Sequence, residues 1–164
     1  MRIAKPKLFS GALVLSALVI LADQVSKWAI GRLVLDPPQV IELTPFFNLV
    51  AAWNPGVSFS MLQGTGPWLL SVAAIGVSLV LVGWLTKQAT PLPALAVGLV
   101  IGGALGNVID RVRLGAVFDF LDFYLGSWHF PAFNLADSSI SVGVALLLLD
   151  GLFHRADLGK TERP

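Results

Sequence analysis

The chain has 164 residues, of which 55% are hydrophobic and only 13% are charged, and its formal net charge is +1. An ordinary soluble domain carries roughly 25% charged residues, so this composition excludes a typical water-soluble domain and also a disordered chain. The near-neutral charge argues against a nucleic-acid partner. The absence of cysteine excludes thiolate chemistry, and two widely spaced histidines do not indicate a zinc site, so we expect neither a metal nor a cofactor.

Four apolar segments are long enough to cross a bilayer, which takes about 20 helical residues. They cover about residues 8–30, 67–86, 92–110 and 133–153. The sequence therefore predicts an all-α membrane protein with four transmembrane helices, forming a single integral membrane domain over residues 1–164.

The basic residues set the expected orientation, since Lys and Arg are enriched on the cytoplasmic side of membrane proteins. Four crossings place both termini on one side, which holds seven of the 11 basic residues, while the other side holds four. We therefore expect cytoplasmic termini. Arg2, Lys5 and Lys7 before the first segment are also typical of a secretory signal peptide. We favour a retained helix, because the apolar character resumes beyond Ala22 and no small-residue cleavage site follows it.

The connection after the first segment, about residues 31–66, is rich in aromatic and β-branched residues. It contains the turn signal Asn54-Pro55-Gly56, so Asn54 has a structural interpretation as a turn residue. We expect this connection to form a small strand-containing cap on the external membrane surface. The second external connection, about residues 111–132, carries aromatic residues that are typical of the membrane interface.

Polar and ionisable side chains gather where the predicted segments reach the outer surface, although such groups are costly at membrane depth. The first and third segments run outward and the fourth runs inward, so their polar residues reach the depth of the external connections. Segments distant in the sequence thus converge on one site. The residues concerned are Asp23, Lys27, Asn54, Asn107, Asp110, Arg111, Asp119, Asn134 and Asp137.

Several of these residues also have a structural interpretation. Asp23 and Lys27 are four residues apart on one helix face and are placed to form an ion pair. Asp110 or Asn107 is placed to orient Arg111 on the third helix. A stripe of small residues on the same helix is typical of close helix packing, and it consists of Gly98, Gly102 and Gly106.

Asp119 and Asp137 are harder to explain as structural residues. Asp137 has no basic residue within one turn of its helix, and Asp119 lies among apolar residues in the run FDFLDF. Two carboxylates brought to one site do not both ionise easily, so one keeps a proton while the other is charged. The charged one can activate water and the protonated one can donate to a carbonyl, which is aspartic-protease chemistry. A proton-coupled carrier or channel is an alternative for the same pair, and a non-catalytic scaffold that binds other helices through the glycine stripe is a third.

Five short motifs follow one another along the chain: Asp23–Lys27 (DQVSK), Asn54–Phe59 (NPGVSF), Gly106–Arg111 (GNVIDR), Val117–Phe120 (VFDF) and Phe130–Ser138 (FPAFNLADS). In their order and spacing they resemble the lipoprotein signal peptidases, or signal peptidase II family, which are bacterial inner-membrane aspartic proteases. Any one of these motifs alone is weak evidence, but five in order on four predicted helices are specific.

The resemblance implies that Asp119 and Asp137 are the catalytic aspartates. The implied substrate is a prolipoprotein, whose signal peptide is removed by a cut just before a diacylglyceryl-modified cysteine. We accordingly expect a multi-pass bacterial inner-membrane enzyme that works as a monomer in the lipid bilayer, with its active site at the outer face. The implied positioning residues are Asn107, Arg111 and Asn134, and the implied supporting residues are Asp23, Lys27 and Asn54.

Overall fold

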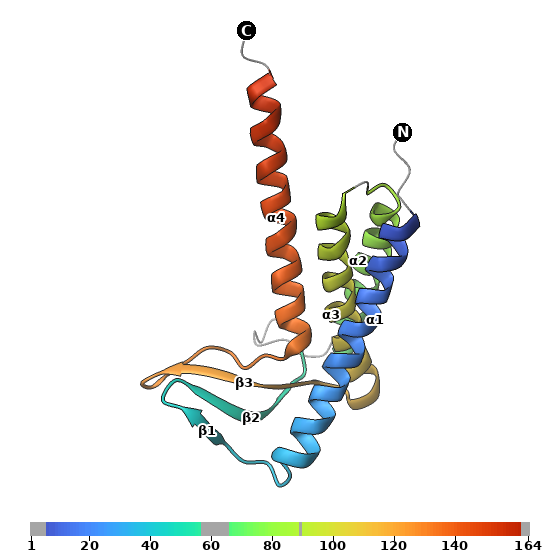
Figure 1. Ribbon diagram of the computed structural model, residues 1–164. Helices are drawn as coiled ribbons and strands as arrows, with labels where there is room; N and C mark the ends of the chain where they lie inside the picture. The colour runs from blue at the N-terminus through green and yellow to red at the C-terminus, as the bar shows by residue number, and fades with distance from the viewer. Residues whose placement is uncertain (1–5, 57–65, 89, 162–164) are drawn as a thin grey trace.

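The computed structural model describes residues 6–56, 66–88 and 90–161. Long helices stand side by side, and a small antiparallel sheet lies at one end of them (Figure 1). In chain order the elements are α1 (Pro6–Ala29), its π-helical continuation η1 (Ile30–Val34), β1 (Ile41–Thr44), β2 (Phe47–Asn54), α2 (Gly66–Leu85), α3 (Pro91–Leu114), β3 (Val117–Leu125), β4 (Trp128–His129) and α4 (Leu135–Thr161).

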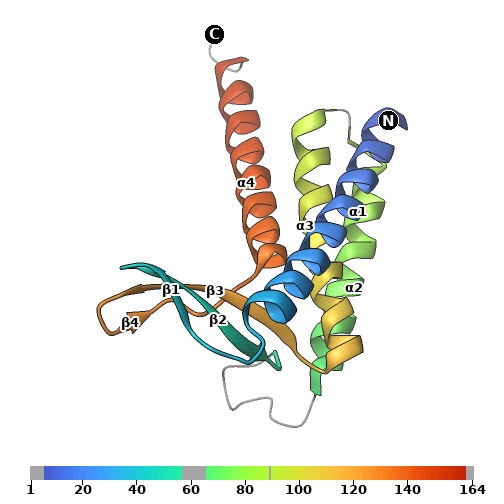
Figure 2. The same cartoon turned by 60° about the horizontal axis from the view of Figure 1, so that its bottom comes forward.

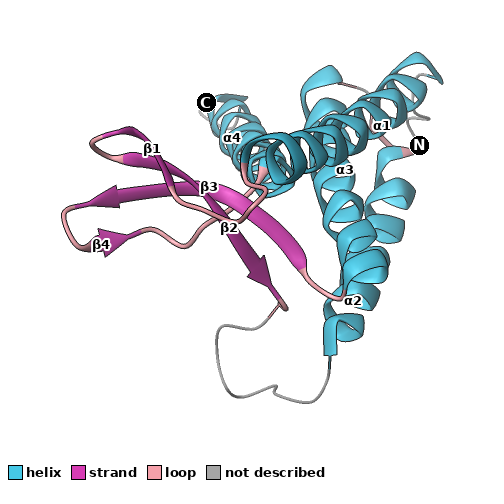
Figure 3. Cartoon of the chain, turned by 90° about the horizontal axis from the view of Figure 1, so that it is seen from below, coloured by secondary structure: helices cyan, strands magenta, loops and turns pink. Residues whose placement is uncertain are grey.

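Within this part of the chain, 4 helices are long and apolar enough to cross a membrane, which confirms the predicted fold class. The start of α1 and the end of α4 lie at the same end of the bundle (Figure 1). The sheet lies at the opposite end and projects to one side of the helices (Figure 3). Towards its C-terminal end, α4 leans away from the other helices (Figure 2).

Local sequence signals explain where α3 ends and α4 begins. Gly115 has a φ of 77°, a left-handed conformation that glycine adopts without strain, and its N–H bonds back to a carbonyl of the last turn of α3. This cap ends the helix at Leu114, beyond the predicted end at residue 110. The fourth helix starts at Leu135 rather than at residue 133, because Asn134 caps it.

The central helix is α3, which packs against α1, α2 and α4 and has 67% of its membrane-spanning window buried. Its small residues permit this close approach. A Cβ atom on Gly98 would lie 2.7 Å from the carbonyl oxygen of Ala12, and one on Gly102 would lie 2.8 Å from that of Ser16. Real side chains do not approach backbone this closely, so the interpretation of the glycine stripe as a packing surface is confirmed.

The sheet has the order β1-β2-β3-β4, and all neighbouring strands are antiparallel. Its first two strands come from the predicted cap, of which residues 57–65 lie outside the described part of the chain. The third strand, β3, comes from the second external connection, where the sequence analysis expected only an aromatic interface. On one face of β3, Phe118 and Phe120 pack with Leu35, and on the other Asp119 is 3% exposed. A strand covered on both faces lacks a clear alternation of apolar and polar residues, which explains why the pattern did not identify it.

Candidate active site

The first turn of α4 holds Asp137 in a fixed position through a reciprocal cap. The side-chain oxygen of Asn134 accepts a hydrogen bond from the Asp137 backbone N–H at 3.0 Å, and the Asp137 carboxylate accepts one from the Asn134 backbone N–H at 3.1 Å. This arrangement satisfies two backbone donors at the helix start. Asp23 of α1 satisfies a third, because its Oδ1 accepts the N–H of Ala136 at 3.0 Å. The carboxylate of Asp137 is thus positioned by its own helix terminus and by α1.

Asn134 also connects the two carboxylates that the sequence analysis paired. Its side-chain Nδ2 donates to Asp119 Oδ1 at 2.7 Å, while its backbone N–H donates to Asp137. Asn54 at the end of β2 donates to the second oxygen of Asp119 at 3.2 Å. The side-chain oxygen Oδ1 of Asn54 accepts a hydrogen bond from the backbone N–H of Gly56 at 2.9 Å. This bond orients the side-chain amide of Asn54 with its NH₂ group towards Asp119. Asn54 is therefore both a turn residue and a partner of Asp119.

Asn107 of α3 binds Asp137 from the other side. Its Nδ2 donates to Asp137 Oδ1 at 2.8 Å, and its Oδ1 accepts hydrogen bonds from Lys27 at 3.0 Å and from Asn134 at 3.2 Å. Because the ammonium of Lys27 can only donate, it fixes which end of the Asn107 amide faces Asp137. The three asparagines on β2, α3 and before α4 thus hold the carboxylates of Asp119 and Asp137 by directed hydrogen bonds.

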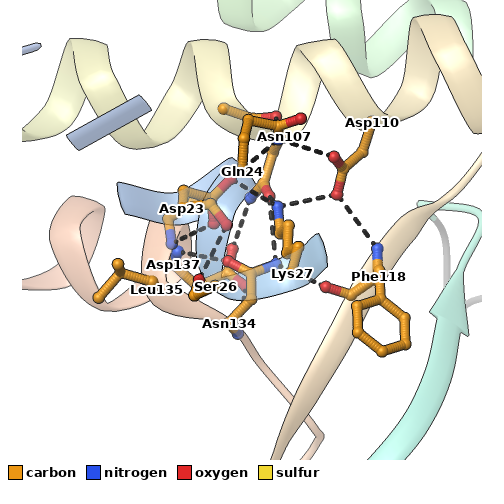
Figure 4. A network of polar contacts seen from close by, with 12 residues as sticks. Asp23, Gln24, Ser26, Lys27, Asn107, Asp110, Phe118, Asn134, Leu135 and Asp137 are labelled. Atoms are coloured by element: carbon orange, nitrogen blue, oxygen red, sulfur yellow. Dashed lines mark hydrogen bonds and ion pairs between the residues drawn. The ribbon is translucent and has the colours of Figure 1, made fainter. Parts of the chain in front are cut away.

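Behind this pair, Lys27 forms a buried ionic cluster (Figure 4). Its Nζ lies 2.8 Å from Asp23 Oδ2 and 2.8 Å from Asp110 Oδ2, and the side chain of Lys27 is 6% exposed. The predicted ion pair between Asp23 and Lys27 is therefore present. From the sequence, Asp110 or Asn107 is expected to orient Arg111, but in the structure both of them bind Lys27.

Gln24 belongs to this cluster, although the sequence analysis did not select it. Its Nε2 donates to Asp110 Oδ1 at 2.8 Å and to Asp23 Oδ2 at 3.2 Å, and so links α1 to α3. Asp110 in turn accepts the backbone N–H of Phe118 at 3.3 Å, which ties α3 to β3. The signal that could have identified Gln24 is an amide at membrane depth, where an unsatisfied polar group is costly.

Arg111 lies beside the carboxylate pair without a fixed partner for its Nε. This nitrogen is buried and has no hydrogen-bond partner among the described residues, and the charges of Asp137 and Asp119 both act on the guanidinium. Gly56 lies close by, since a Cβ atom placed on it would be 3.6 Å from the Arg111 Nε. A buried donor without a partner is costly in a folded protein. Arg111 therefore has a donor available for a ligand next to Asp119 and Asp137.

The environment of Asp119 favours its protonated form. Burial raises the pKa of this carboxyl, and the negative charge of Asp137 raises it further. Hydrogen bonds from Asn54 and Asn134 and the positive charge of Lys27 lower it, and the resulting pKa is about 6 against an ordinary value of 3.8. Two neighbouring carboxylates that share one proton provide a general base and a general acid in the same site.

The described residues offer no alternative site with metal chemistry. Within residues 6–56, 66–88 and 90–161, no group of three or more His, Cys, Asp or Glu side chains is placed to hold a metal ion. In the cluster around Lys27, the carboxylates of Asp23 and Asp110 are bound by one ammonium and by the amide of Gln24. The arrangement as a whole is suited to proton transfer at Asp119 and Asp137, whose carboxylates accept hydrogen bonds from the surrounding asparagines.

Comparison with known proteins identifies relatives along most of the chain. The family model described as signal peptidase (SPase) II matches residues 15–153. A protein of Shewanella oneidensis named lipoprotein signal peptidase is 45% identical over 88% of this chain and 88% of its own. Proteins of the same name from Aeromonas hydrophila and Burkholderia vietnamiensis are 47% and 48% identical, over 84% and 87% of this chain and 85% and 90% of their own.

Solved structures show the same architecture. One, described as a bacterial membrane enzyme determined by the in meso method at 2.3 Å resolution, has a TM-score of 0.79 at 31% identity and covers 94% of both chains. A second, described in the same way at 1.9 Å resolution, has a TM-score of 0.78 at 32% identity and covers 87% of this chain and 93% of its own. The helices and the sheet are thus a shared fold.

Proposed function

Since the chain belongs to the signal peptidase II family, it is a protease of prolipoprotein signal peptides, and we propose that it works as an aspartic endopeptidase with Asp119 and Asp137 as its catalytic pair. The observation that supports this most directly is the bridge through Asn134. This one residue donates hydrogen bonds to both carboxylates, which come from different elements, β3 and α4. The pKa of Asp119, about 6, is suited to a pair that holds one proton.

In the proposed reaction, the ionised carboxylate removes a proton from a water molecule, and the water oxygen attacks the carbonyl carbon of the scissile peptide bond. The protonated carboxyl donates its proton to the carbonyl oxygen, so that a neutral tetrahedral species forms. The proton taken from water then passes to the leaving nitrogen as the carbon–nitrogen bond breaks, while a hydroxyl of the tetrahedral species returns its proton to the carboxylate that had donated one. The pair returns to its singly protonated state at the end of the cycle.

The other residues would support this pair and hold the substrate. The asparagines Asn54, Asn107 and Asn134 keep the carboxylates in place, and the Nε of Arg111 would donate to a backbone carbonyl of the bound peptide. Asp23 and Lys27 would fix the helix ends that carry the site. The proposed substrate is a prolipoprotein that carries a diacylglyceryl cysteine, with the cut just before this cysteine.

The family and the four helices support a multi-pass protein of the bacterial inner membrane. We further propose that the termini are cytoplasmic and that the carboxylate pair faces the outer side, because basic residues are concentrated with the termini. A lipid-anchored substrate would present its cleavage point at that depth. We propose that the chain acts as a monomer in the bilayer, since one chain contributes both carboxylates and, among the described residues, the asparagines that bind them.

The test is a gel-shift cleavage assay with purified protein in detergent. A prolipoprotein with its diacylglyceryl group and the same protein without it are offered to wild type, Asp119→Asn and Asp137→Asn. Asp122→Asn is the matched control, because Asp122 is also buried on β3 but binds Asn48 and His129 instead of the pair. We expect cleavage of the lipidated form alone, lost in both pair variants and kept in the control. Full turnover by either pair variant would show that the assignment is wrong.

Proton uptake measured beside cleavage separates this proposal from the transport alternative. A proton-coupled carrier would need a polar path across the whole bilayer. In the described part of the chain, the buried charged cluster lies at the sheet end of the helices, whereas contacts such as Gly98 against Ala12 close the bundle farther along α1 and α3. Proton uptake by proteoliposomes that is lost in Asp137→Asn, together with no cleavage by folded wild type, would favour transport.

A further inference from the structure

A cavity of about 460 Å³ lies beneath the sheet, away from the carboxylate pair. It is partly open and is bordered by the end of α1, by η1 and the residues after it, by the last turn of α3, and by β2 and β3. Its walls combine apolar and aromatic side chains, among them Trp28, Trp53 and Phe118, with polar and charged ones. No residue of the catalytic pair lines it. The cavity is therefore a separate feature of the molecule.

The sheet itself separates the cavity from the proposed active site. Successive side chains of a strand point to opposite faces, so Phe118 faces the cavity while Asp119 points to the other face, where Asn134 binds it. Trp53 pairs with Phe118 across the two strands, and their ring centroids are 5.0 Å apart. Lys27 and Asp110 reach the cavity from its inner side, but they are bound to each other at 2.8 Å. They are therefore not free to bind a charged ligand.

The charges that remain available are at the rim. Arg32 of η1 and Arg113 in the last turn of α3 are both exposed and both line the cavity, and Asp36 is the exposed acidic residue there. Arg113 also offsets the partial negative charge at the carbonyl end of α3. These three side chains carry a net charge of +1, which a single phosphodiester would neutralise. Guanidinium groups are suited to phosphate because their planar donors match its oxygens.

The position of the cavity indicates which kind of phosphate compound can reach it. It lies at the sheet end of the membrane-spanning helices, and the exposed Trp28 and Trp53 are of the type that occupies the membrane interface. A lipid headgroup at this depth would place its phosphate at the arginines and its glycerol and first methylene groups against the tryptophans. We propose that this cavity binds the headgroup of a glycerophospholipid, with Arg32 and Arg113 holding its phosphate.

This proposal is independent of the catalytic assignment, and its test measures lipid binding rather than cleavage. The full chain, purified and delipidated in detergent, is titrated with phosphatidylglycerol, and bound lipid is counted by native mass spectrometry alongside the shift in melting temperature. We expect the double variant Arg32→Gln with Arg113→Gln to bind at least tenfold more weakly than wild type. The matched control Lys87→Gln changes an exposed basic residue at the other end of the bundle and should bind as wild type does.

Two further arms identify the ligand chemistry. Diacylglycerol, which lacks the phosphate, and inorganic phosphate, which lacks the lipid, should each bind far more weakly than phosphatidylglycerol. Because Arg113 also donates to Gln24 at 3.4 Å, the single variant Arg32→Gln and the pair of Arg→Lys substitutions are measured as well. The first should lose part of the binding, and the second should bind more tightly than the Arg→Gln pair but more weakly than wild type, because the charge remains and the planar donors are lost. Wild-type binding by the folded double variant, equal binding of diacylglycerol, or full displacement by inorganic phosphate would overturn the proposal.

Discussion

Replacing Asp119 by asparagine should abolish cleavage and yet stabilise the folded chain at neutral pH. The pKa of the folded carboxyl is about 6 against an ordinary 3.8, so the folded state binds this proton more tightly than the unfolded state. The stabilisation that the proton provides is complete below pH 3.8 and is lost as the pH rises through about 6. Above that pH, ionised Asp119 lowers the free energy of unfolding by about 3 kcal/mol, because each pH unit between the two pKa values corresponds to about 1.4 kcal/mol.

Asparagine has nearly the shape of the carboxylate and no charge, so it removes this cost but also loses an acceptor. Its single carbonyl oxygen cannot serve both Asn54 and Asn134, and the donor left over costs about 1–2 kcal/mol. We therefore expect the free energy of unfolding of Asp119→Asn to exceed that of wild type by about 1–2 kcal/mol at pH 8. Near pH 4 the order should reverse, because the wild-type carboxyl is then protonated and uncharged.

Unfolding of both proteins in detergent, followed by tryptophan fluorescence between pH 4 and 8, measures this difference. The control is Glu42→Gln, which removes an exposed carboxylate from β1 and should leave the difference from wild type nearly constant with pH. The comparison is made between variant and wild type at each pH, so that titration of other groups cancels. If the free-energy difference between Asp119→Asn and wild type does not change between pH 4 and 8, the pKa of Asp119 is not raised and the reasoning fails.

Three further predictions address the frame around the pair. Asp137→Asn should lower the pKa of Asp119 from about 6 towards 3.8, because a neighbouring negative charge is removed. Carbon-13 NMR of the aspartate carboxyl groups measures this pKa, and an unchanged value would contradict the coupling between the two carboxyls. Lys27→Met should lower the free energy of unfolding by about 3–5 kcal/mol, because it leaves two buried carboxylates without their cation. A denaturant titration measures this change, and a loss of less than about 1 kcal/mol would contradict the stabilising role of the ionic cluster. Gly102→Ala should lower the free energy of unfolding by about 1–3 kcal/mol, because the added Cβ would meet α1. The control is Gly76→Ala on α2, where an added Cβ meets nothing within 4 Å, and this variant should melt as wild type does.

The sequence determined the membrane-spanning helices because their length and composition are imposed by the bilayer itself. Apolar runs of this length have one stable solution in lipid, a helix that satisfies its own backbone. The spacing of Gly98 and Gly102 was sufficient to predict a packing surface, whereas the predicted boundaries at residues 110 and 133 missed the helix end before Gly115 and the cap at Asn134. The same constraint explains the shared depth of Asp23, Asn107 and Asp137, because their positions along the helices follow from the boundaries of the spans.

Only the tertiary structure decided how these groups pair. The strand β3 is recognisable only once β2 lies beside it, since the pairing of Ala52 with Asp119 joins two external connections that are far apart in the sequence. The choice of Lys27, rather than Arg111, as the partner of Asp110 depends on how closely α1 approaches α3. Gln24 and the bridge through Asn134 depend in the same way on which helix ends meet. Hydrogen bonds and ion pairs act over a few ångströms, so the packing of distant segments determines them and the spacing of residues along the chain does not.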